Sequence, residues 1–444
     1  MKERFLDVSA EAESRQGERF ETWLSGQGIP FADESAKAAY RERCTLIKDA
    51  IQLKKPPARI PICPSAGFFP AEYAGITMYE AMYDYEALKK AWIKYHEDFA
   101  PDAYNSPANI VPGRALDILD FRLYQWPGHG VGRDREYQFV EKEYMRPGEY
   151  QDLIDDPTAF FLNAYFPRIF GALEPLSTFP LLPPVHEIPV VPSFLMPFGS
   201  EGMKAALEAL GRAGDEVLRW RTVAGQINAS IMGKGFPAFS GGFTKAPFDV
   251  IGDSLRGTRG VMLDMFRYPD ELKEACERLT PIMVKCGALS CRGAGHIMPL
   301  IPLHKGADGF MSREQFAEFY WPTLRKLIIG LINEGIVPLL FAEGSYNTRL
   351  DIIRDMPVGK AVWWFDRTDM KKAKEVVGQT VCIAGNVPLD LLCTATPAEV
   401  EAYCRELAEA AGAGGGFILS SGAGIQGSRA ENVKAMMDFS RRDL

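Results

Sequence analysis

The sequence predicts an α/β fold, a (β/α)8 TIM barrel with an N-terminal helical extension and a large insertion between strands 2 and 3. Three observations support this prediction. Eight short segments are mostly apolar throughout, as strands covered on both faces of a parallel sheet are. Amphipathic helical segments separate these strands from the third onward, as in repeated βα units. The second and third strands are separated by the long segment 110–234, which must hold an insertion.

Residues 1–55 are predicted to form the helical extension, and residues 56–444 the barrel. The segment SAKAAYRERCTLIKDAIQL places apolar residues at helical spacing. It stops before Pro56 and Pro57, and proline cannot continue a helix.

The predicted strands follow one another along the rest of the chain. They are ARIPICPS (58–65), PDAYNSPAN (101–109), GFPAFSGG (235–242), GHIMPLIPL (295–303), IVPLLFAEG (336–344), GKAVWWFD (359–366), QTVCIAGN (379–386) and GGFILSSG (415–422). The helices predicted between them are DELKEACERLTPIMVKC, SREQFAEFYWPTLRKLIIGLINEG, MKKAKEVVG and TPAEVEAYCRELAEAAG. The insertion contains the aromatic and proline-rich loops YQWPGHGVGRD and FPLLPPVHEIPVVPSFLMPF.

Composition excludes several classes of protein. The net charge of −8, with no basic block, argues against a nucleic-acid partner. Eight scattered cysteines without a CxxC motif indicate reduced thiols rather than a disulfide framework. The charged N-terminus lacks the apolar core of a signal peptide, and the longest apolar run is broken by Asn333 and Glu334. We therefore expect a cytoplasmic protein with no membrane span.

Polar side chains follow several of the predicted strands. Barrel enzymes place their chemistry at the carboxyl ends of the strands, so these side chains are expected to converge on one mouth. The residues are His304 after strand 4, Glu343 after strand 5, Asp366 and Asp369 after strand 6, Asn386 after strand 7 and Ser421 after strand 8.

Glu343 is the main candidate catalytic residue, because a carboxylate at the end of an apolar strand needs a partner or a function. A buried ion pair is the alternative. His304, which precedes Lys305, is a candidate metal ligand or proton donor, since the pKa of histidine lies near neutrality. A satisfied core histidine is its alternative. Glu343 and His304 together form the candidate metal site.

Asp366 and Tyr346 complete the set of candidate catalytic residues. Tyr346 either donates a hydrogen bond to a developing oxyanion or only covers the end of the barrel. Strand alternation aims Trp363 and Phe365 one way, and Trp364 and Asp366 the other. Trp364 is then either an aromatic platform for the substrate or part of the barrel packing. Asp369 is equally consistent with a helix cap.

The remaining candidates are substrate-binding residues. Asn386 either binds the substrate or fixes its own turn. Arg256 either holds an anionic substrate group or forms a surface ion pair. His129, and His186 with Glu187, lie in loops of the insertion, where a histidine is more often structural or solvated.

Three segments resemble the uroporphyrinogen decarboxylase superfamily over roughly residues 56–440. The tail CIAGNVPLDLLCTATPAEVEAYCRELAEAAGAGGGFILSSGAGI resembles that superfamily's GN-apolar-DP segment, TPEEV helix and glycine-rich last strand. KAPFDVIGDSLRG (245–257) and DGFMSREQFAEFYWPTLRKL (308–327) are similar to two further elements of the superfamily. The resemblance implies a (β/α)8 barrel.

The departures from the true decarboxylases concern the groups that bind a porphyrinogen. Pro64 and Phe68 stand at the positions of two arginines, Pro107 at that of the central aspartate, and Ala423 at that of a late histidine. A bidentate contact between arginine and a carboxylate has no apolar substitute. The sequence therefore does not resemble a true uroporphyrinogen decarboxylase in its site.

The resemblance to the corrinoid-dependent methyltransferases of the superfamily implies a different activity. Many of them bind zinc through an H-x-C motif and a late cysteine; here these positions are Phe341-Ala342-Glu343 and Ala423. Only Glu343 keeps the capacity to bind a metal, and oxygen and nitrogen ligands still suit zinc. We expect a methyltransferase that moves a methyl group from a small O-methyl donor, an aryl methyl ether for example, to a corrinoid-binding protein. Zinc is an optional cofactor.

Two other readings remain open on the sequence alone. One is a lyase that decarboxylates a smaller acid, with Arg256 and Lys305 as the anion clamp. The other is a non-catalytic barrel that binds a cofactor or a partner. The binding protein predicts that Glu343→Gln leaves the chain folded and its binding unaltered, whereas release of carbon dioxide without a corrinoid indicates the lyase.

Overall fold

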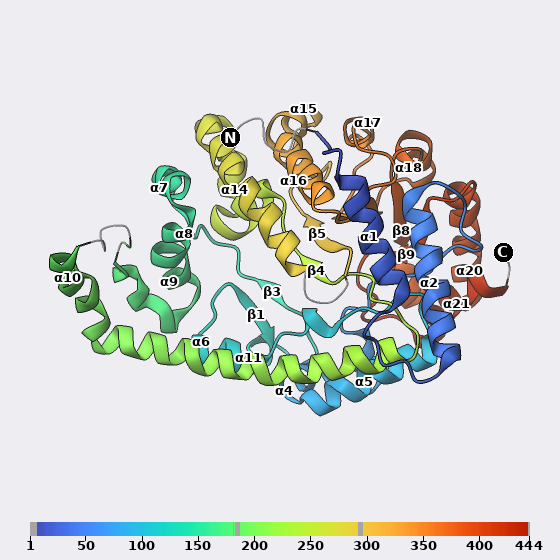
Figure 1. Cartoon of the computed structure of the whole chain (residues 1–444), viewed down its shortest axis with the longest axis horizontal. Coiled ribbons are helices and arrows are strands. Elements are labelled where there is room, and N and C mark those ends of the chain that lie inside the picture. Colours follow the sequence, from blue (N-terminus) through green and yellow to red (C-terminus); the bar gives the residue numbers. More distant parts are fainter. Residues whose placement is uncertain (1–6, 181, 183–186, 292–295, 443–444) are drawn as a thin grey trace.

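The computed structural model describes residues 7–180, 182, 187–291 and 296–442. Six parallel strands form its main sheet, in the order β4-β5-β6-β7-β8-β9 (Figure 1). They are β4 (Gly242–Phe243), β5 (Pro299–Leu303), β6 (Leu339–Ala342), β7 (Val362–Phe365), β8 (Cys382–Val387) and β9 (Phe417–Ser421). Each of the five neighbouring pairs is parallel, as the sequence predicts.

Two extended segments before β4 close this sheet. Ile62 pairs in parallel with Leu419 of β9, and the N–H of Asp102 donates to the carbonyl of Ile62. Tyr104 pairs in parallel with Ala238, which precedes β4 in the same segment. The predicted first and second strands therefore join the last strand to the third. The predicted order of the strands is confirmed, with strand 1 reduced to isolated bridges at Ile62 and Ser65 and strand 2 to one bridge at Tyr104.

Side chains alternate between the barrel interior and the outer helices. Leu339 and Trp364 belong to an apolar cluster inside the barrel, whereas Leu340, Trp363 and Phe365 pack in the layer between the sheet and the helices. This is the period-two alternation expected of a strand. The prediction that Trp363 and Phe365 point away from Trp364 is confirmed.

Helices cover the outside of the barrel. The main ones are α14 (Pro269–Ser290), α16 (Trp321–Asn333), α18 (Met370–Val377), α20 (Pro397–Leu407) and α21 (Ala430–Arg442). The carboxylate of Asp369 accepts from the N–H of Lys372, so Asp369 caps α18, as one of its two readings predicts. The predicted helix 312–335 is divided into α15 (Arg313–Gln315), η8 (Phe316–Tyr320) and α16, since Pro322 has no N–H to continue the regular ladder.

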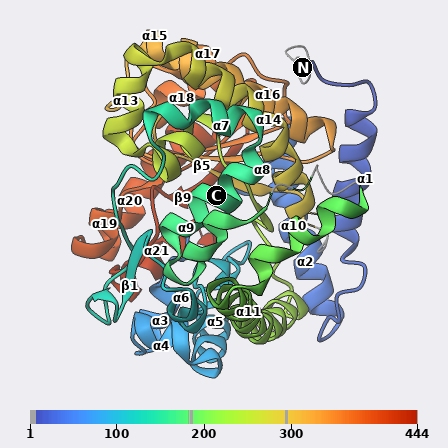
Figure 2. The same ribbon diagram turned by 90° about the vertical axis from the view of Figure 1, so that its left-hand side faces the viewer.

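The two N-terminal helices cover the amino ends of the strands. α1 (Ala12–Ser25) and α2 (Glu34–Gln52) lie together along one edge of the molecule (Figure 2). Phe20, Trp23 and Ile47 from these helices share an apolar cluster with Val337 and Ile297, which precede β6 and β5. One end of the barrel is thereby sealed, and the opposite end is left for the site. Where the chain divides into domains stays a prediction.

The segment between the second and third strands forms a separate layer. Its small sheet has the order β2-β1-β3, with β1 (Tyr124–Pro127), β2 (Gly130–Val131) and β3 (Gln138–Phe139). The long helix α11 (Glu201–Gly233) runs beneath the molecule in Figure 1, beside α5 (Tyr85–Phe99). Ile227 and Ile231 of α11 pack on Trp92 of α5.

Shorter helices complete the chain. They are α3 (Phe69–Tyr73), α4 (Met78–Tyr83), α6 (Gly113–Leu119), α7 (Tyr150–Asp155), α8 (Pro157–Phe160), α9 (Phe166–Ile169), α10 (Val191–Leu195), α12 (Pro247–Asp249), α13 (Gly257–Arg267), α17 (Leu350–Ile353) and α19 (Leu389–Thr394). The helical turns are η1 (Pro107–Asn109), η2 (Pro147–Glu149), η3 (Phe161–Tyr165), η4 (Gly171–Thr178), η5 (Ile188–Val190), η6 (Met196–Gly199), η7 (Val250–Leu255) and η9 (Ala408–Gly412). In the described ranges, no helix is long and apolar enough to cross a bilayer.

Candidate active site

A cavity of about 710 Å³ lies at the carboxyl ends of β5, β6, β7 and β9. We call it the mouth cavity. Asp253, His304, Lys305, Glu343, Asp366 and Arg367 supply charged groups to its wall, and Tyr124 and Phe139 reach it from the small sheet of the insertion. Three of the four predicted catalytic residues, His304, Glu343 and Asp366, therefore meet in one place.

His304 lies between two carboxylates. Its Nδ1 is 2.5 Å from Oδ2 of Asp253, and its Nε2 is 3.4 Å from Oε1 of Glu343. Burial lowers the pKa of His304, but the hydrogen bonds and charges of Asp253 and Glu343 outweigh burial and raise the pKa to about 10. The side chain is thus a cation at neutral pH, and its Nε2 lies beside Glu343 at the mouth cavity.

Asp253, which was not predicted from the sequence, holds His304 in place. Its carboxylate contacts Nζ of Lys245 at 2.7 Å and Nζ of Lys305 at 3.1 Å, in addition to His304. Burial raises the pKa of Asp253, but the hydrogen bond from His304 and the charge of Lys245 outweigh burial, and the pKa ends below its ordinary value. One carboxylate therefore serves three cations.

Asp249, also missed, holds the backbone after β5. Its carboxylate accepts from the N–H groups of His304 and Lys305 at 3.1 and 2.9 Å, and from the hydroxyl of Tyr320 at 2.6 Å. A signal for both aspartates was present in the sequence. Lys245, Asp249 and Asp253 recur every four residues in the segment that resembles an element of the superfamily.

Glu343 and Asp366 occupy neighbouring strand ends. Oδ2 of Asp366 accepts from the N–H of Gly344 at 2.9 Å, which ties the loop after β7 to the loop after β6. Burial raises the pKa of Asp366, and the charge of Glu343 adds to that shift. Glu343 is half-exposed and faces the mouth cavity, where it contacts Nε2 of His304.

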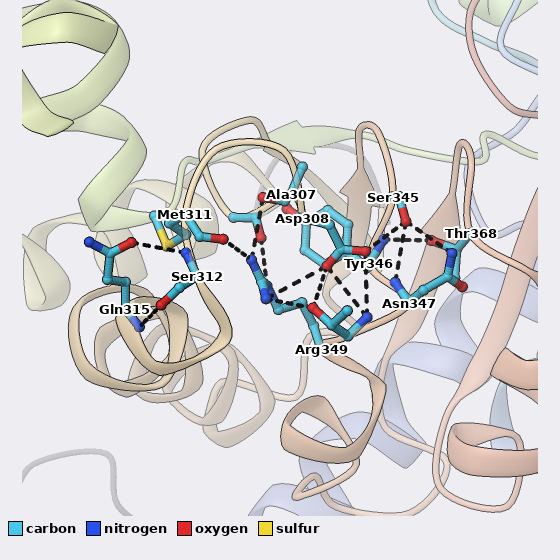
Figure 3. A network of polar contacts seen from close by, with 12 residues as sticks. Ala307, Asp308, Met311, Ser312, Gln315, Ser345, Tyr346, Asn347, Arg349 and Thr368 are labelled. Atoms are coloured by element: carbon cyan, nitrogen blue, oxygen red, sulfur yellow. Dashed lines mark hydrogen bonds and ion pairs between the residues drawn. The ribbon is translucent and has the colours of Figure 1, made fainter.

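A polar network behind the mouth fixes the loops that carry these residues (Figure 3). The buried guanidinium of Arg349 donates to the carbonyls of Gly306 and Met311, and the carboxylate of Asp308 accepts from Ser345 and Thr348. These contacts join the loop after β5 to the loop after β6. The two residues that face each other across the mouth, His304 and Glu343, are therefore held by a common support.

Tyr346 belongs to this support and not to the reacting groups. It is fully buried, and its hydroxyl donates to the carbonyl of Leu303 at 3.2 Å. Gly344, with φ of +78°, turns the chain so that Tyr346 enters the core instead of the mouth. The prediction that Tyr346 donates to a developing oxyanion is wrong.

Arg256 is also wrongly predicted as a substrate-binding residue. It is 2% exposed, and its Nε lies 2.5 Å from Oδ2 of Asp264. Its Nη1 also reaches Glu143 at 3.0 Å and donates to the carbonyl of Met145. The guanidinium is committed to the packing of the insertion against α13, and it does not line the mouth cavity.

Substitution of Arg256 tests that structural role. Arg256→Met is expected to lower the free energy of unfolding by about 3–5 kcal/mol, because it leaves the buried carboxylate of Asp264 without its cation and with only the hydroxyl of Tyr150 as a partner. Urea denaturation measures this change. Affinity for any ligand of the mouth cavity should stay within about 2-fold of wild type, since the residue lies outside the cavity. A large loss of affinity in a stably folded Arg256→Met protein contradicts this assignment.

Asn386 and Trp364 both bond to the backbone of a neighbouring strand end. The amide of Asn386 donates to the carbonyls of Asp366 and Thr368 at 3.0 and 2.8 Å, so it fixes the loop after β7 rather than its own turn. The indole N–H of Trp364 donates to the carbonyl of Ser421 at 2.8 Å. Trp364 faces the barrel interior, next to Phe341 at 4.6 Å between ring centroids.

The predicted histidines of the insertion do not reach the mouth. His129 stacks on Trp126, and its Nε2 lies 3.0 Å from the hydroxyl of Tyr83 and 3.3 Å from Asp117. It lines neither the mouth cavity nor the cavity inside the barrel, and its contacts are those of a structural histidine, the alternative that the sequence also allows. His186 lies outside the described residues.

The raised pKa of His304 links stability to pH. Because its pKa of about 10 in the fold exceeds the ordinary value of 6.5, protonation stabilises the fold fully below about pH 6.5. That contribution is lost as the pH rises to about 10. Urea denaturation across this range should show wild type losing stability relative to His304→Gln. Parallel curves for the two proteins contradict the assignment.

A known protein family matches the part of the chain that carries the candidate site. Residues 231–442 match the family model described as Uroporphyrinogen decarboxylase (URO-D), and this span carries His304, Glu343 and Asp366. Residues 231–442 are therefore similar to the uroporphyrinogen decarboxylase family. No curated protein sequence matches the chain.

A likeness to a solved structure extends over most of the molecule. A solved structure described as a methyltransferase from Methanosarcina mazei matches with a TM-score of 0.56 and 17% sequence identity. The match covers 91% of this chain and 98% of the other. At this identity the likeness concerns the fold alone, and it includes the insertion as well as the barrel.

The residues present do not fit the zinc site of the superfamily's methyltransferases. In the described part of the chain, no three His, Cys, Asp or Glu side chains are grouped so that they could hold a metal ion. Both nitrogens of His304 face carboxylates, and a doubly protonated imidazole has no lone pair for a metal. Ala423 lines the mouth where a late thiolate is expected. The predicted ligand pair Glu343 and His304 is an ion pair in this structure.

Proposed function

We propose that this protein is a methyltransferase that takes a methyl group from a small O-methyl donor and delivers it to a corrinoid-binding partner protein. One observation carries the proposal: a cationic His304, held between Asp253 and Glu343, faces an open cavity at the barrel mouth. A methyl ether releases its oxygen poorly unless a proton neutralises the charge that develops on that oxygen. His304 is placed to supply that proton.

The roles of the side chains follow from their contacts. Nε2 of His304 gives its proton to the leaving oxygen as the bond between that oxygen and the methyl carbon breaks. Glu343, 3.4 Å from Nε2, holds the imidazole ring in place and balances its charge before the proton leaves. Asp253 keeps the second proton on Nδ1 and fixes the ring orientation. Solvent then returns the proton to His304.

The pKa of His304 favours an aryl ether among the O-methyl donors. A phenol has a pKa near 10, and hydrogen bonds to Asp253 and Glu343 raise the pKa of His304 to about 10 despite burial. Proton transfer to a departing phenolate is therefore nearly balanced in free energy. An alkoxide is a much poorer leaving group, and its departure demands a stronger acid. The reaction is then an O-demethylation that releases a phenol.

The acceptor has access to the mouth. The corrinoid, carried by the partner protein, supplies the nucleophile that accepts the methyl group. The rim of the mouth includes the 82% exposed side chain of Arg367, while Tyr124 and Phe139 cover the cavity from the insertion. The aromatic rings exclude water from the donor side, which limits loss of the proton of His304 to solvent.

The direct test is an assay of methyl transfer. The purified protein is mixed with a reduced corrinoid protein and a panel of neutral and charged methyl donors, and the methylated corrinoid is followed by its absorbance. The proposal predicts transfer from at least one aryl methyl ether, with release of the matching phenol. Failure to transfer a methyl group from any donor of the panel overturns it.

The alternative function as a lyase is not supported by the contacts of its two predicted anion-binding residues. It requires an anion clamp, but Arg256 is paired with Asp264 and Glu143, and Lys305 is paired with Asp253. Phe68, at the position of a superfamily arginine, is buried among apolar side chains. Release of carbon dioxide from a small acid without any corrinoid would favour the lyase.

A further inference from the structure

A second cavity, of about 330 Å³, lies deeper than the mouth cavity, between the barrel interior and the insertion. We call it the inner cavity. Leu300, Leu339 and Trp364 form its floor inside the barrel, and Asn228 reaches it from α11. Its wall therefore combines the third, fourth, fifth and sixth strands with the long helix of the insertion.

The side chains around the inner cavity are polar but uncharged. They are Ser65, Asn105, Ser106, Asn109, Asn228 and Ser240, with His296 beside them. Burial lowers the pKa of His296, which keeps this imidazole neutral at pH 7. Among the described residues that line this cavity, none carries a charge. The mouth cavity, by contrast, is rich in both signs of charge.

Flat aromatic surfaces complete the wall. Trp92, Phe239 and Trp364 line the inner cavity, and both indole N–H groups are already used, by the carbonyls of Asn105 and Ser421. These side chains therefore offer rings rather than hydrogen-bond donors. An aromatic ligand gains from packing against such rings.

One polar atom in the wall lacks a partner. Oδ1 of Asn228 is buried and accepts no hydrogen bond from any described residue. A buried acceptor without a donor is unfavourable unless water or a ligand supplies the donor. The hydroxyl of a bound ligand would satisfy it.

The backbone is adapted to this cavity at Gly241. A Cβ at this position would lie 1.7 Å from Cγ of His296, so only glycine lets the imidazole lie against the strand. The close approach brings His296 to the wall of the cavity that Asn228 also lines.

From these observations we infer that the inner cavity binds an uncharged, single-ring aromatic molecule that carries a hydroxyl group. A cavity of about 150 Å³ already admits benzene, so a volume of about 330 Å³ holds one substituted ring. The rings supply the packing, and Oδ1 of Asn228 accepts the hydroxyl proton. A carboxylate-bearing ligand is disfavoured, because nothing in the described wall would balance its charge.

The inner cavity adjoins the mouth cavity in two places. Phe341 of the mouth contacts Trp364 of the inner cavity, and Gly424 of the mouth pairs with Ser65 of the inner cavity. On the proposed function, on which this last assignment rests, the bound ring is that of the methyl donor or of the phenol that it leaves. Binding itself does not depend on methyl transfer.

Binding of guaiacol (2-methoxyphenol), measured by calorimetry on the full chain without any corrinoid, tests the inference. We expect one neutral guaiacol per chain, quenching of tryptophan fluorescence, and no binding of benzoate. Asn228→Leu should raise the Kd roughly 3- to 10-fold through loss of one hydrogen bond. Ala108→Trp, at an exposed position on the cavity rim, should abolish binding.

Gln226→Leu is the matched control, since it lies on the same helix but does not line the cavity. Asn228→Leu removes a buried acceptor that has no partner among the described residues, so its unfolding midpoint should fall by no more than that of Gln226→Leu. The inference is overturned if guaiacol does not bind, or if it binds and neither cavity variant changes its affinity. The inner cavity would then hold solvent only. Guaiacol binding without methyl transfer from any donor overturns the proposed function instead. Methyl transfer from charged donors, with no guaiacol binding, overturns this inference and leaves the proposed function standing.

Discussion

His304→Gln lowers the rate of methyl transfer by about 10²- to 10⁴-fold, the usual contribution of a positioned proton donor. The imidazolium lies between Asp253 and Glu343 with Nε2 directed toward the mouth cavity. Glutamine fills similar space and still hydrogen-bonds, but it cannot give up a proton. We expect the loss in kcat, with KM for the donor changed by less than about 3-fold, since binding is left largely intact.

The matched control for this variant is His129→Gln. His129 is a partly exposed histidine of the insertion that lines neither cavity. It should keep wild-type kcat. Equal activity of His304→Gln and His129→Gln would show that His304 takes no part in the reaction. An effect of His304→Gln on KM alone would show that His304 only binds the donor.

Asp253→Asn lowers the free energy of unfolding by about 3–5 kcal/mol, the effect of removing one partner from a buried ion pair. The carboxylate is the shared partner of His304, Lys245 and Lys305, and its side chain is almost buried. Without it, three cations crowd one site, and only Asp249 and Glu343 among the described neighbours are left to balance them. Urea denaturation at pH 7 measures the change.

A second effect separates this role from a loss of packing. The hydrogen bond and charge of Asp253 help to raise the pKa of His304, so the variant should titrate His304 at lower pH. Asp253→Glu should restore part of the stability, and Asp215→Asn, at an exposed position of α11, should leave it unchanged. An Asp253→Asn protein as stable as wild type contradicts the central role of this carboxylate.

The barrel could be predicted because its strands are apolar on both faces, which distinguishes them from the rest of the chain. His304, Glu343 and Asp366 followed from the same logic, since parallel strands bring their carboxyl ends to one edge. The first two strands were overestimated in length. They pair only through isolated bridges at Ile62, Ser65 and Tyr104, and an apolar pattern does not reveal how far pairing extends.

The rest of the site depends on where loops turn, which a single sequence does not show. Asp253 comes from the helical turn after the third strand and folds over the mouth toward His304. Arg256, only three residues later, points instead to Asp264, so neighbours in sequence have opposite roles. Tyr346 was misassigned because the turn at Gly344 sends it into the core.

Nuclear magnetic resonance titration of His304 tests the account most directly. The chain has five histidines, so ¹⁵N-labelled imidazoles can be resolved, and the His304→Gln spectrum identifies the signal. Hydrogen bonds to Asp253 and Glu343 outweigh burial and raise the pKa of His304 to about 10, so both ring nitrogens should stay protonated through pH 8. A midpoint at or below the ordinary value of 6.5 would show a neutral imidazole and contradict the proposed proton donor.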